Sequence, residues 1–163
     1  MKLFTTATFA ALAFCAAGAA SAADPKATIA DLDARLAKIG VAKIDGTEKA
    51  GDKTVPALYF GERKINNNYD VVDAIRKAHT ATATVFVKTG DEFVRVSTNV
   101  LTPEGKRGVG TQLARNPAYA ALAKGEQFCG PIDVLGTAFD ACYNPIKDGS
   151  GKIIGASYIG HKK

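Results

Sequence analysis

From residue 82 to the end of the chain, apolar residues alternate with polar ones at a period of two, and tight-turn signals interrupt the alternation. This is the pattern of half-buried β-strands joined by hairpins. Turns are predicted at three places: Thr89-Gly90-Asp91, Leu135-Gly136, and residues 148–151 (DGSG). Strands joined by such short turns can only run antiparallel, so the second half of the chain is constrained to form an antiparallel sheet.

The first half has helical periodicity instead. Ile29, Leu32, Leu36 and Ile39 recur at spacings of three and four before Gly40, which predicts an amphipathic helix ended by a glycine cap. A second helix is expected over residues 69–79 (YDVVDAIRKAH), after an asparagine run at 66–68 that is typical of a turn and a helix cap.

The segments between these elements are predicted as follows. Residues 45–54 (DGTEKAGDKT) are polar and glycine-punctuated, which indicates a loop, and residues 55–60 (VPALYF) form a short strand at a sheet edge because of Pro56. Residues 102–110 form a glycine-rich loop, after which Thr111 caps a helix that starts near Gln112 and is interrupted by Pro117. The fold class is therefore α+β, with the long helix covering the apolar face of one sheet.

The first hairpin has two chemically different faces. In a register centred on Gly90-Asp91, Val85, Val87, Val94 and Val96 share one face, and Phe86, Lys88, Phe93, Arg95 and Ser97 share the other. The second face either lies in solvent or lines a mostly apolar pocket in which one cation fixes an anionic ligand.

Residues 1–22 have the composition of a cleavable signal peptide. Lys2 gives a positive start, an alanine-rich apolar run follows, and Ala20-Ser21-Ala22 is a small-residue cleavage pattern. The run is short and weakly hydrophobic for a membrane span, which takes about 20 apolar residues. We therefore expect cleavage near Ala22 and a single domain over residues 23–163 with no membrane anchor, located in the periplasm or outside the cell.

Charge does not favour a nucleic-acid partner. Lys and Arg number 21 and Asp and Glu 16, a formal net charge of +5. These charges are spread along the chain, without the arginine stripe interleaved with aromatic residues that would indicate a nucleic-acid interface.

Cys129 and Cys142 could form a redox couple, half of a metal site or a disulfide. If Leu135-Gly136 is a two-residue turn, Cys129 faces Cys142 at a non-hydrogen-bonded position, where Cα atoms are about 4.5 Å apart. A thioredoxin-like couple has two intervening residues, and a zinc site needs four ligands, whereas the two histidines, His79 and His161, are distant in sequence. We predict a structural disulfide, worth about 3 kcal/mol for a loop of about 14 residues, and no metal site.

Four segments carry a resemblance to a known family: 55–75 (VPALYFGERKINNNYDVVDAI), 85–100 (VFVKTGDEFVRVSTNV), 105–113 (GKRGVGTQL) and 116–160. They resemble the extracytoplasmic Cache sensor domains of bacterial chemoreceptors and sensor kinases, with the Cache-3/Cache-2 type the most similar. The runs from Gly125 to Gly136 and from Phe139 to Asp148 are its most specific parts. The resemblance covers roughly residues 45–160 and implies a PAS-like Cache fold, in which a long N-terminal helix packs on a five-stranded antiparallel sheet with a ligand pocket over the opposite face.

The chain departs from that family in two respects. Its receptors are anchored by transmembrane helices and continue into cytoplasmic signalling modules, whereas this sequence has a cleavable signal and stops at Lys163. The cysteine pair is also not a usual part of the family pattern. We therefore expect the domain either to pass its message to a partner, such as a membrane-bound sensor or transporter, or to act as a carrier.

The resemblance also implies a small organic acid or amino acid as the ligand. Arg95 is the first candidate for its carboxylate, because arginine can hold a carboxylate bidentately, although a surface arginine on a strand would look the same. The further candidates are Phe86, Phe93, Thr111, Tyr119, Phe139, Tyr143 and Lys147. For the aromatic candidates a role as ordinary core residues stays open, as does simple helix capping for Thr111, and Asp148 is expected to hold its turn.

Catalysis is not expected. The sequence has no Gly-x-Ser-x-Gly elbow, His-Glu-x-x-His motif or P-loop, and His79 falls at a predicted helix end. We expect a ligand-binding sensor domain without a cofactor. The alternative is a non-enzymatic interaction protein with a vestigial pocket that docks on a membrane sensor or transporter.

Overall fold

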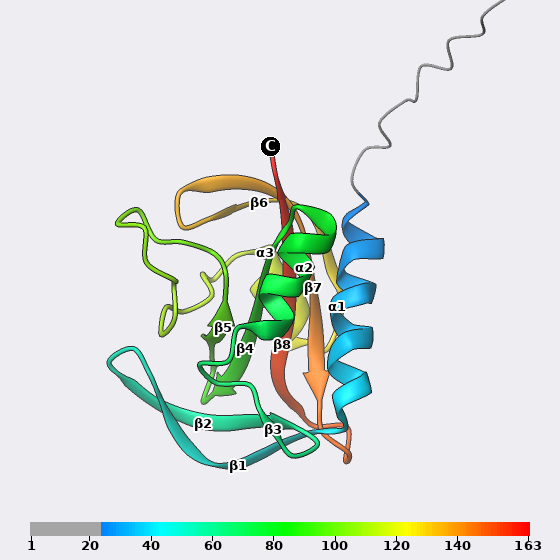
Figure 1. Ribbon diagram of the computed structural model, residues 1–163, viewed down its shortest axis with the longest axis vertical. Helices are drawn as coiled ribbons and strands as arrows, with labels where there is room; N and C mark the ends of the chain where they lie inside the picture. The colour runs from blue at the N-terminus through cyan, green and yellow to red at the C-terminus, as the bar shows by residue number, and fades with distance from the viewer. Residues whose placement is uncertain (1–23) are drawn as a thin grey trace, which may run out of the picture.

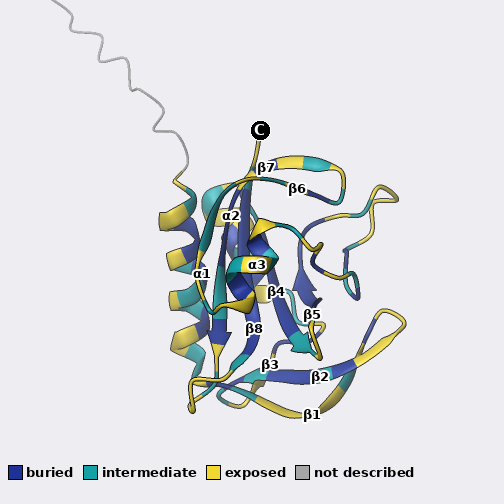
Figure 2. Ribbon diagram, turned by 180° about the vertical axis from the view of Figure 1, so that it is seen from behind, coloured by how far each residue is buried: buried dark blue, intermediate teal, exposed yellow. Residues whose placement is uncertain are grey.

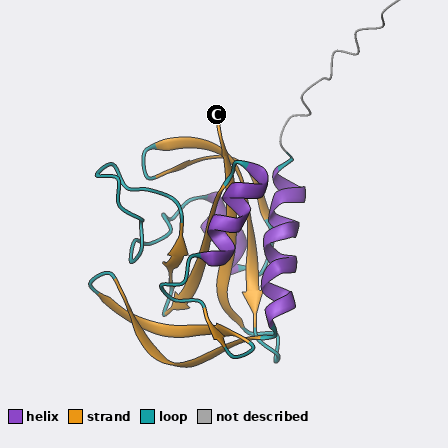
Figure 3. Cartoon of the chain, in the orientation of Figure 1, coloured by secondary structure: helices purple, strands orange, loops and turns teal. Residues whose placement is uncertain are grey.

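The computed structural model describes residues 24–163, and the expected signal peptide with its cleavage near Ala22 lies outside them (Figure 1). The predicted α+β class is confirmed. A five-stranded antiparallel sheet has the order β5-β4-β8-β7-β6, and a smaller antiparallel sheet has the order β1-β2-β3. Figure 3 shows the strands in orange and the helices in purple. The helices are α1 (Pro25–Ile39), α2 (Asp70–His79) and α3 (Pro117–Ala123). The strands are β1 (Ala42–Ala50), β2 (Lys53–Phe60), β3 (Arg63–Lys64), β4 (Thr82–Thr89), β5 (Glu92–Thr98), β6 (Phe128–Val134), β7 (Thr137–Lys147) and β8 (Ile153–Lys162).

The two predicted long helices form and lie together on one face of the five-stranded sheet (Figure 1). The Asp24 side chain accepts a hydrogen bond from the Lys26 N–H at 2.9 Å, and Pro25 occupies the first turn, so α1 begins with two standard start signals. Its apolar stripe is buried and Gly40 ends it, as predicted. No helix formed by residues 24–163 has the length and apolar character needed to cross a bilayer.

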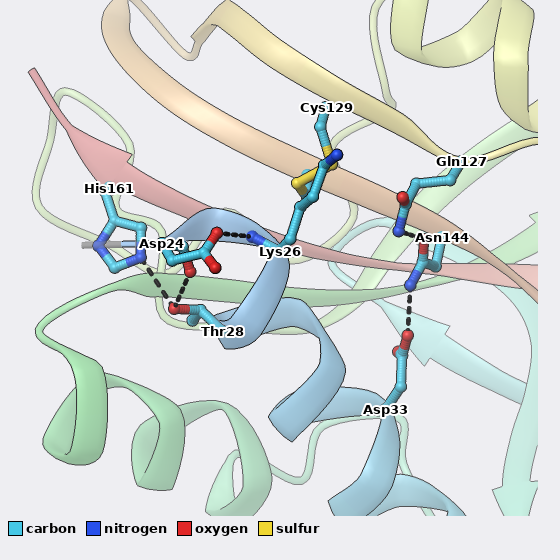
Figure 4. Close-up of a disulfide and its surroundings, with 9 residues drawn as sticks. Asp24, Lys26, Thr28, Asp33, Gln127, Cys129, Asn144 and His161 are labelled. Carbon is cyan, nitrogen blue, oxygen red and sulfur yellow. Dashed lines mark hydrogen bonds between the residues drawn. A yellow bond between two sulfur atoms is a disulfide. The ribbon is translucent and has the colours of Figure 1, made fainter. Parts of the chain in front are cut away.

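The β6–β7 hairpin forms in the predicted register. Leu135 and Gly136 both have positive φ, 51° and 84°, which is the requirement of a two-residue type I′ turn. Cys129 pairs with Cys142, their Cα atoms are 4.1 Å apart, and a disulfide joins them (Figure 4). The structural disulfide is therefore confirmed.

The β4–β5 hairpin follows its predicted register only as far as Phe86 opposite Arg95. A bulge then shifts the pairing, so that Val85 lies opposite Ser97. Directly opposed residues point to the same face, so Ser97 lies on the face of Val85. There the Ser97 hydroxyl donates to the carbonyl of Asn68, just before α2. The prediction that Ser97 shares a face with Phe86 and Arg95 is therefore wrong.

The prediction of a loop over residues 45–54 is also wrong, because most of this segment belongs to the strands of the β1–β2 hairpin. In β1 the two buried residues are Ala42 and Ala50, at its ends, and the polar residues between them are mostly exposed. Pro56 of β2 lies opposite Thr47 of β1. Within residues 24–163, no strand pairs with Pro56 on its other side, because the two-residue β3 pairs only with Tyr59 and Phe60.

A helix near Gln112 does not form. Residues 110–113 instead run along the outer edge of β5, where the Arg95 N–H donates to the Thr111 carbonyl and the Leu113 N–H donates to the Phe93 carbonyl, both at 2.9 Å. We call residues 99–116 the strap. The next helix, α3, begins at Pro117 with Asn116 as its cap.

The five-stranded sheet thus has two covered faces, which Figure 2 shows as dark blue strands between partly exposed covering elements. The helix face packs against α1, α2 and the β1–β2 hairpin, with buried residues such as Leu32, Ile75, Val85, Val94 and Ile159. The strap face packs against α3 and the strap, with buried residues such as Phe86, Phe93, Leu122, Tyr143 and Tyr158.

Candidate functional site

Arg95 lies in the middle of the strap face and is only 3% exposed. One terminal nitrogen donates to the Thr111 hydroxyl at 2.9 Å and to the Gln112 carbonyl at 3.1 Å, and the guanidinium lies 4.9 Å from the centre of the Phe86 ring. Its Nε is buried without a hydrogen-bond partner. Arg95 takes part in none of the ion pairs formed within residues 24–163.

A buried cation without a carboxylate is costly, because neutral dipoles replace water only in part. Burial lowers the pKa of Arg95, but an arginine starts so high that its guanidinium stays charged at working pH. The site therefore holds a full positive charge, with a neutral hydroxyl, a carbonyl and an aromatic ring as its neighbours. This is an arrangement that can accept an anion.

Two tyrosines of the strap-face cluster lie beyond Phe86, on β7 and β8, and the Tyr143 ring is 6.4 Å from the Phe86 ring between their centroids. The rings of Tyr143 on β7 and Tyr158 on β8 have centroids 4.8 Å apart. The Tyr143 hydroxyl is buried without a partner, whereas the Tyr158 hydroxyl is 3.0 Å from the Thr82 hydroxyl. Burial raises the pKa of Tyr143 and raises the pKa of Tyr158 to about 12, so both phenols stay protonated and can donate.

The strap closes this face at its centre. The Thr111 hydroxyl donates to the Gly108 carbonyl at 2.6 Å while it accepts from Arg95, so it holds a strap turn and the buried cation together. The expected helix-capping role of Thr111 does not occur, since no helix follows it. The Tyr119 hydroxyl donates to the Asp91 carbonyl at 2.7 Å, and its ring meets Phe93 edge-on at 6.0 Å.

Two arginines attach the strap to the rest of the fold. Arg107, in the middle of the strap, binds Asp73 of α2 through two hydrogen bonds of 2.8 Å and lies over the Tyr69 ring. Near the end of the strap, Arg115 binds the Glu92 carboxylate and lies over the Tyr119 ring at 4.2 Å. The cover of Arg95 is thus attached by side chains to α2 and to the start of β5.

The structure brings together seven of the eight sequence-predicted ligand residues. Arg95, Phe86, Phe93, Thr111, Tyr119, Phe139 and Tyr143 all belong to the strap-face cluster or touch it. Lys147 does not. It is exposed at the end of β7, and its ammonium lies near Gly125 after α3.

Sequence reasoning missed Tyr158, which lies against Tyr143. The alternation of β8 contains the signal, because Tyr158 is two residues from Ala156, which pairs with Phe86.

Arg95 is 3% exposed and Tyr143 is fully buried, so the strap face is closed over its charged centre. Neither residue lines any of four hollows, of about 280 to 740 Å³, found on the surface of residues 24–163. Within residues 24–163, no group of three or more His, Cys, Asp or Glu side chains is placed to hold a metal ion. His161 instead contacts Thr28 at 3.0 Å (Figure 4), and His79 pairs with Asp31 at 2.8 Å.

Comparison with known proteins identifies the family. A search of curated proteins gives no match. Among solved structures, the crystal structure of the E. coli DcuS sensor domain has 22% sequence identity and a TM-score of 0.42, over 56% of this chain and 63% of that one, so the chain spans less than two thirds of its length. The model of the Cache 3/Cache 2 fusion domain matches residues 29–163, which is nearly the whole described part. The chain therefore belongs to the Cache 3/Cache 2 fusion domain family.

Proposed function

We propose that this protein is an extracytoplasmic sensor-type domain that binds a small carboxylate, such as an organic acid or an amino acid, at Arg95 and reports its presence to a partner protein. The observation that carries the proposal is the buried Arg95 guanidinium. It has no carboxylate partner within residues 24–163, and its Nε lacks a hydrogen bond.

A carboxylate would complete the unsatisfied chemistry of this site. One oxygen can accept from the free Nε, and the unpartnered Tyr143 hydroxyl is a second donor on the same face. Charge-assisted hydrogen bonds of this kind are short and strong, and arginine offers them in a planar fork. Phe86 and Phe93 would supply the apolar walls that complete such a pocket.

Ligand entry on this account requires the strap to open, because Thr111 and Gln112 now occupy one Arg95 nitrogen. A ligand carboxylate would replace these two neutral acceptors with a charged one. The change would be transmitted through the strap to its two arginine attachments, at Asp73 and Glu92. This coupling offers a route from the site to the surface without catalysis.

The test is a thermal-shift screen with organic acids and amino acids. A ligand that binds the folded state raises stability by RT ln(1 + [L]/Kd), about 2.7 kcal/mol at a hundredfold excess over Kd. We expect the shift to disappear in Arg95→Met and to persist in Arg76→Met, a matched change of an exposed arginine on α2. A shift that survives in Arg95→Met would refute the assigned site.

The packed strap face favours one alternative, an interaction protein whose pocket is vestigial. None of the four hollows opens on Arg95. If no acid in a broad screen stabilises the protein and a membrane sensor or transporter is captured by it, the alternative replaces the sensor assignment.

A further inference from the structure

The start of β1 and the β7–β8 turn lie at the end of the molecule opposite the C-terminus (Figure 1). Two adjoining hollows are found at this end. The first, of about 740 Å³, lies between the start of β1, the β4–β5 turn and the β7–β8 turn. The second, of about 470 Å³, lies between the end of α1 and the end of β7. Val41 and Ala42 line both, so the hollows meet there. We call the pair the distal groove.

The groove exposes apolar side chains on a fixed backbone. Val41 is 67% exposed and Ile44 is 39% exposed, and they are two of the three large apolar residues exposed in residues 24–163. The backbone is held because a Cβ on Gly40 would come within 2.5 Å of Gly61, whose own N–H donates to the Val41 carbonyl at 3.0 Å. Single exposed apolar residues are ordinary, whereas two beside a concave surface form a small apolar patch that a partner can contact.

The charges of the groove are unbalanced. Lys88 and Lys152 line the first hollow, and neither forms an ion pair within residues 24–163. The one carboxylate there, Asp148, holds its own turn by accepting from Ser150 and from the Lys152 N–H. Lys43, the third lysine of the lining, pairs with Glu62, so the first hollow presents two lysines without ion pairs in the described chain beside one carboxylate, whose Oδ1 holds the turn.

The second hollow adds no free anion. Its carboxylate, Asp33, accepts from the Asn144 amide at 2.5 Å (Figure 4). It also accepts from the Ser157 hydroxyl at 2.6 Å. The two hollows of about 740 and 470 Å³ together exceed the roughly 300–1,000 Å³ of a typical small-molecule site. Because the two hollows are large and meet at Val41, they suit an extended peptide segment that runs from one into the other.

We propose that the distal groove docks an extended acidic segment of a protein partner. An apolar side chain of that segment would pack beside Val41 and Ile44, and its carboxylates would meet Lys88 and Lys152. Complementary charges of this kind speed encounter and fix orientation, while the apolar contact supplies affinity. This inference rests on the part of the proposed function that assigns a partner, and it names the surface involved.

The experiment titrates the capped peptide Ac-Glu-Leu-Asp-Leu-Glu-NH2 into the isotope-labelled protein and follows backbone amides by NMR. We expect saturable shifts at Val41–Ile44, at Lys88–Gly90 and in the β7–β8 turn. The double variant Lys88→Glu/Lys152→Glu should weaken binding about tenfold, and Val41→Ser about fivefold. The matched controls Leu101→Ser and Lys106→Glu, exposed residues elsewhere, should leave binding unchanged.

Three results would overturn the proposal: no saturable shift in the groove, equal binding of the charge-reversed peptide Ac-Lys-Leu-Lys-Leu-Lys-NH2, or equal weakening by the control variants. Groove shifts produced by free succinate at the same concentrations would make it a small-molecule site instead. The Arg95→Met variant separates this question from the proposed ligand site, because it should lose stabilisation by organic acids and keep peptide binding.

Discussion

The helix face and the strap face belong to the same sheet but differ in chemistry. The helix face is lined mainly by aliphatic side chains, and its buried polar residues Asn66, Ser97 and Asn99 all make hydrogen bonds. The strap face is rich in aromatic residues and contains the buried Arg95, with unpartnered donors on Arg95 and Tyr143.

We infer from this difference that the helix face stabilises the fold and that the strap face carries the proposed site. The helix face satisfies the rules of a stable core, because its apolar groups are packed and its polar groups are paired. The strap face breaks those rules at its centre, where a charge is buried at a cost to stability. The fold does not need a buried charge here. We therefore expect this loss of stability to be retained because a bound ligand completes the site.

The largest effect should come from truncation of the helix-face core. Leu32 is fully buried between α1 and the sheet. We expect Leu32→Ala to lower the free energy of unfolding by about 2–5 kcal/mol, because it loses apolar burial and leaves a cavity. Urea denaturation measures this, and a loss below about 1 kcal/mol would show that the helix face is not the main core.

The disulfide should have the next largest effect, and its residues pack against the helix face. Replacing both cysteines by alanine should cost about 3 kcal/mol, since the unfolded chain regains the entropy of the closed loop. Reduction of the unchanged protein is the companion measurement. A double variant as stable as the oxidised protein would contradict the prediction.

On the strap face we do not expect substitution of the central residue to lower the free energy of unfolding in this way. Arg95→Met removes a buried unpaired charge and keeps a long side chain, so we expect unfolding free energy to change by no more than about 1 kcal/mol, or to rise. The same urea denaturation measures it. A loss as large as that of Leu32→Ala would mean that Arg95 serves as a structural residue and would remove the contrast between the faces.

The smallest expected effect is a dependence of stability on pH that comes from Asp33, a carboxyl group of α1. Burial raises the pKa of Asp33 above its ordinary value of 3.8, although hydrogen bonds from Ser157 and Asn144 oppose the change. A raised folded-state pKa means that the contribution of Asp33 to stability is full below 3.8 and is lost as pH rises through the raised pKa.

Asp33→Asn cannot titrate, so its stability relative to the unchanged protein should increase across that pH range and stay level outside it. Denaturant midpoints measured at several pH values would show this. A difference that is constant with pH would mean that folding leaves the pKa of Asp33 unchanged, and a change in the opposite direction would mean that its carboxylate is stabilised by its surroundings.

Local patterns predicted much of this fold. The β6–β7 register and the disulfide follow from a two-residue turn, and α1 follows from its spacing and its glycine cap. The strand β1 could not be predicted in this way, because its middle residues are polar and mostly exposed and its pairing with β2 defines it. The bulge before Ser97 likewise depends on contacts with Asn68, far away in sequence.

The candidate site was predictable to a similar extent. Alternation placed Phe86, Phe93 and Arg95 on one face, and that grouping is found. The lack of an ion pair at Arg95, its contact with Thr111 and the proximity of Tyr158 depend on how strap and strands meet in space. No sequence spacing contains that information.

The most direct test of the central claim is to observe the Arg95 Nε–H itself by NMR of the arginine side chains. Arg95→Met identifies the signal by its loss, and the protein is then titrated with an acid found in the thermal screen. We predict a large shift of this one signal on saturation, because its unpartnered hydrogen gains a carboxylate. An acid that stabilises the protein and leaves the Arg95 signal unmoved would contradict the account.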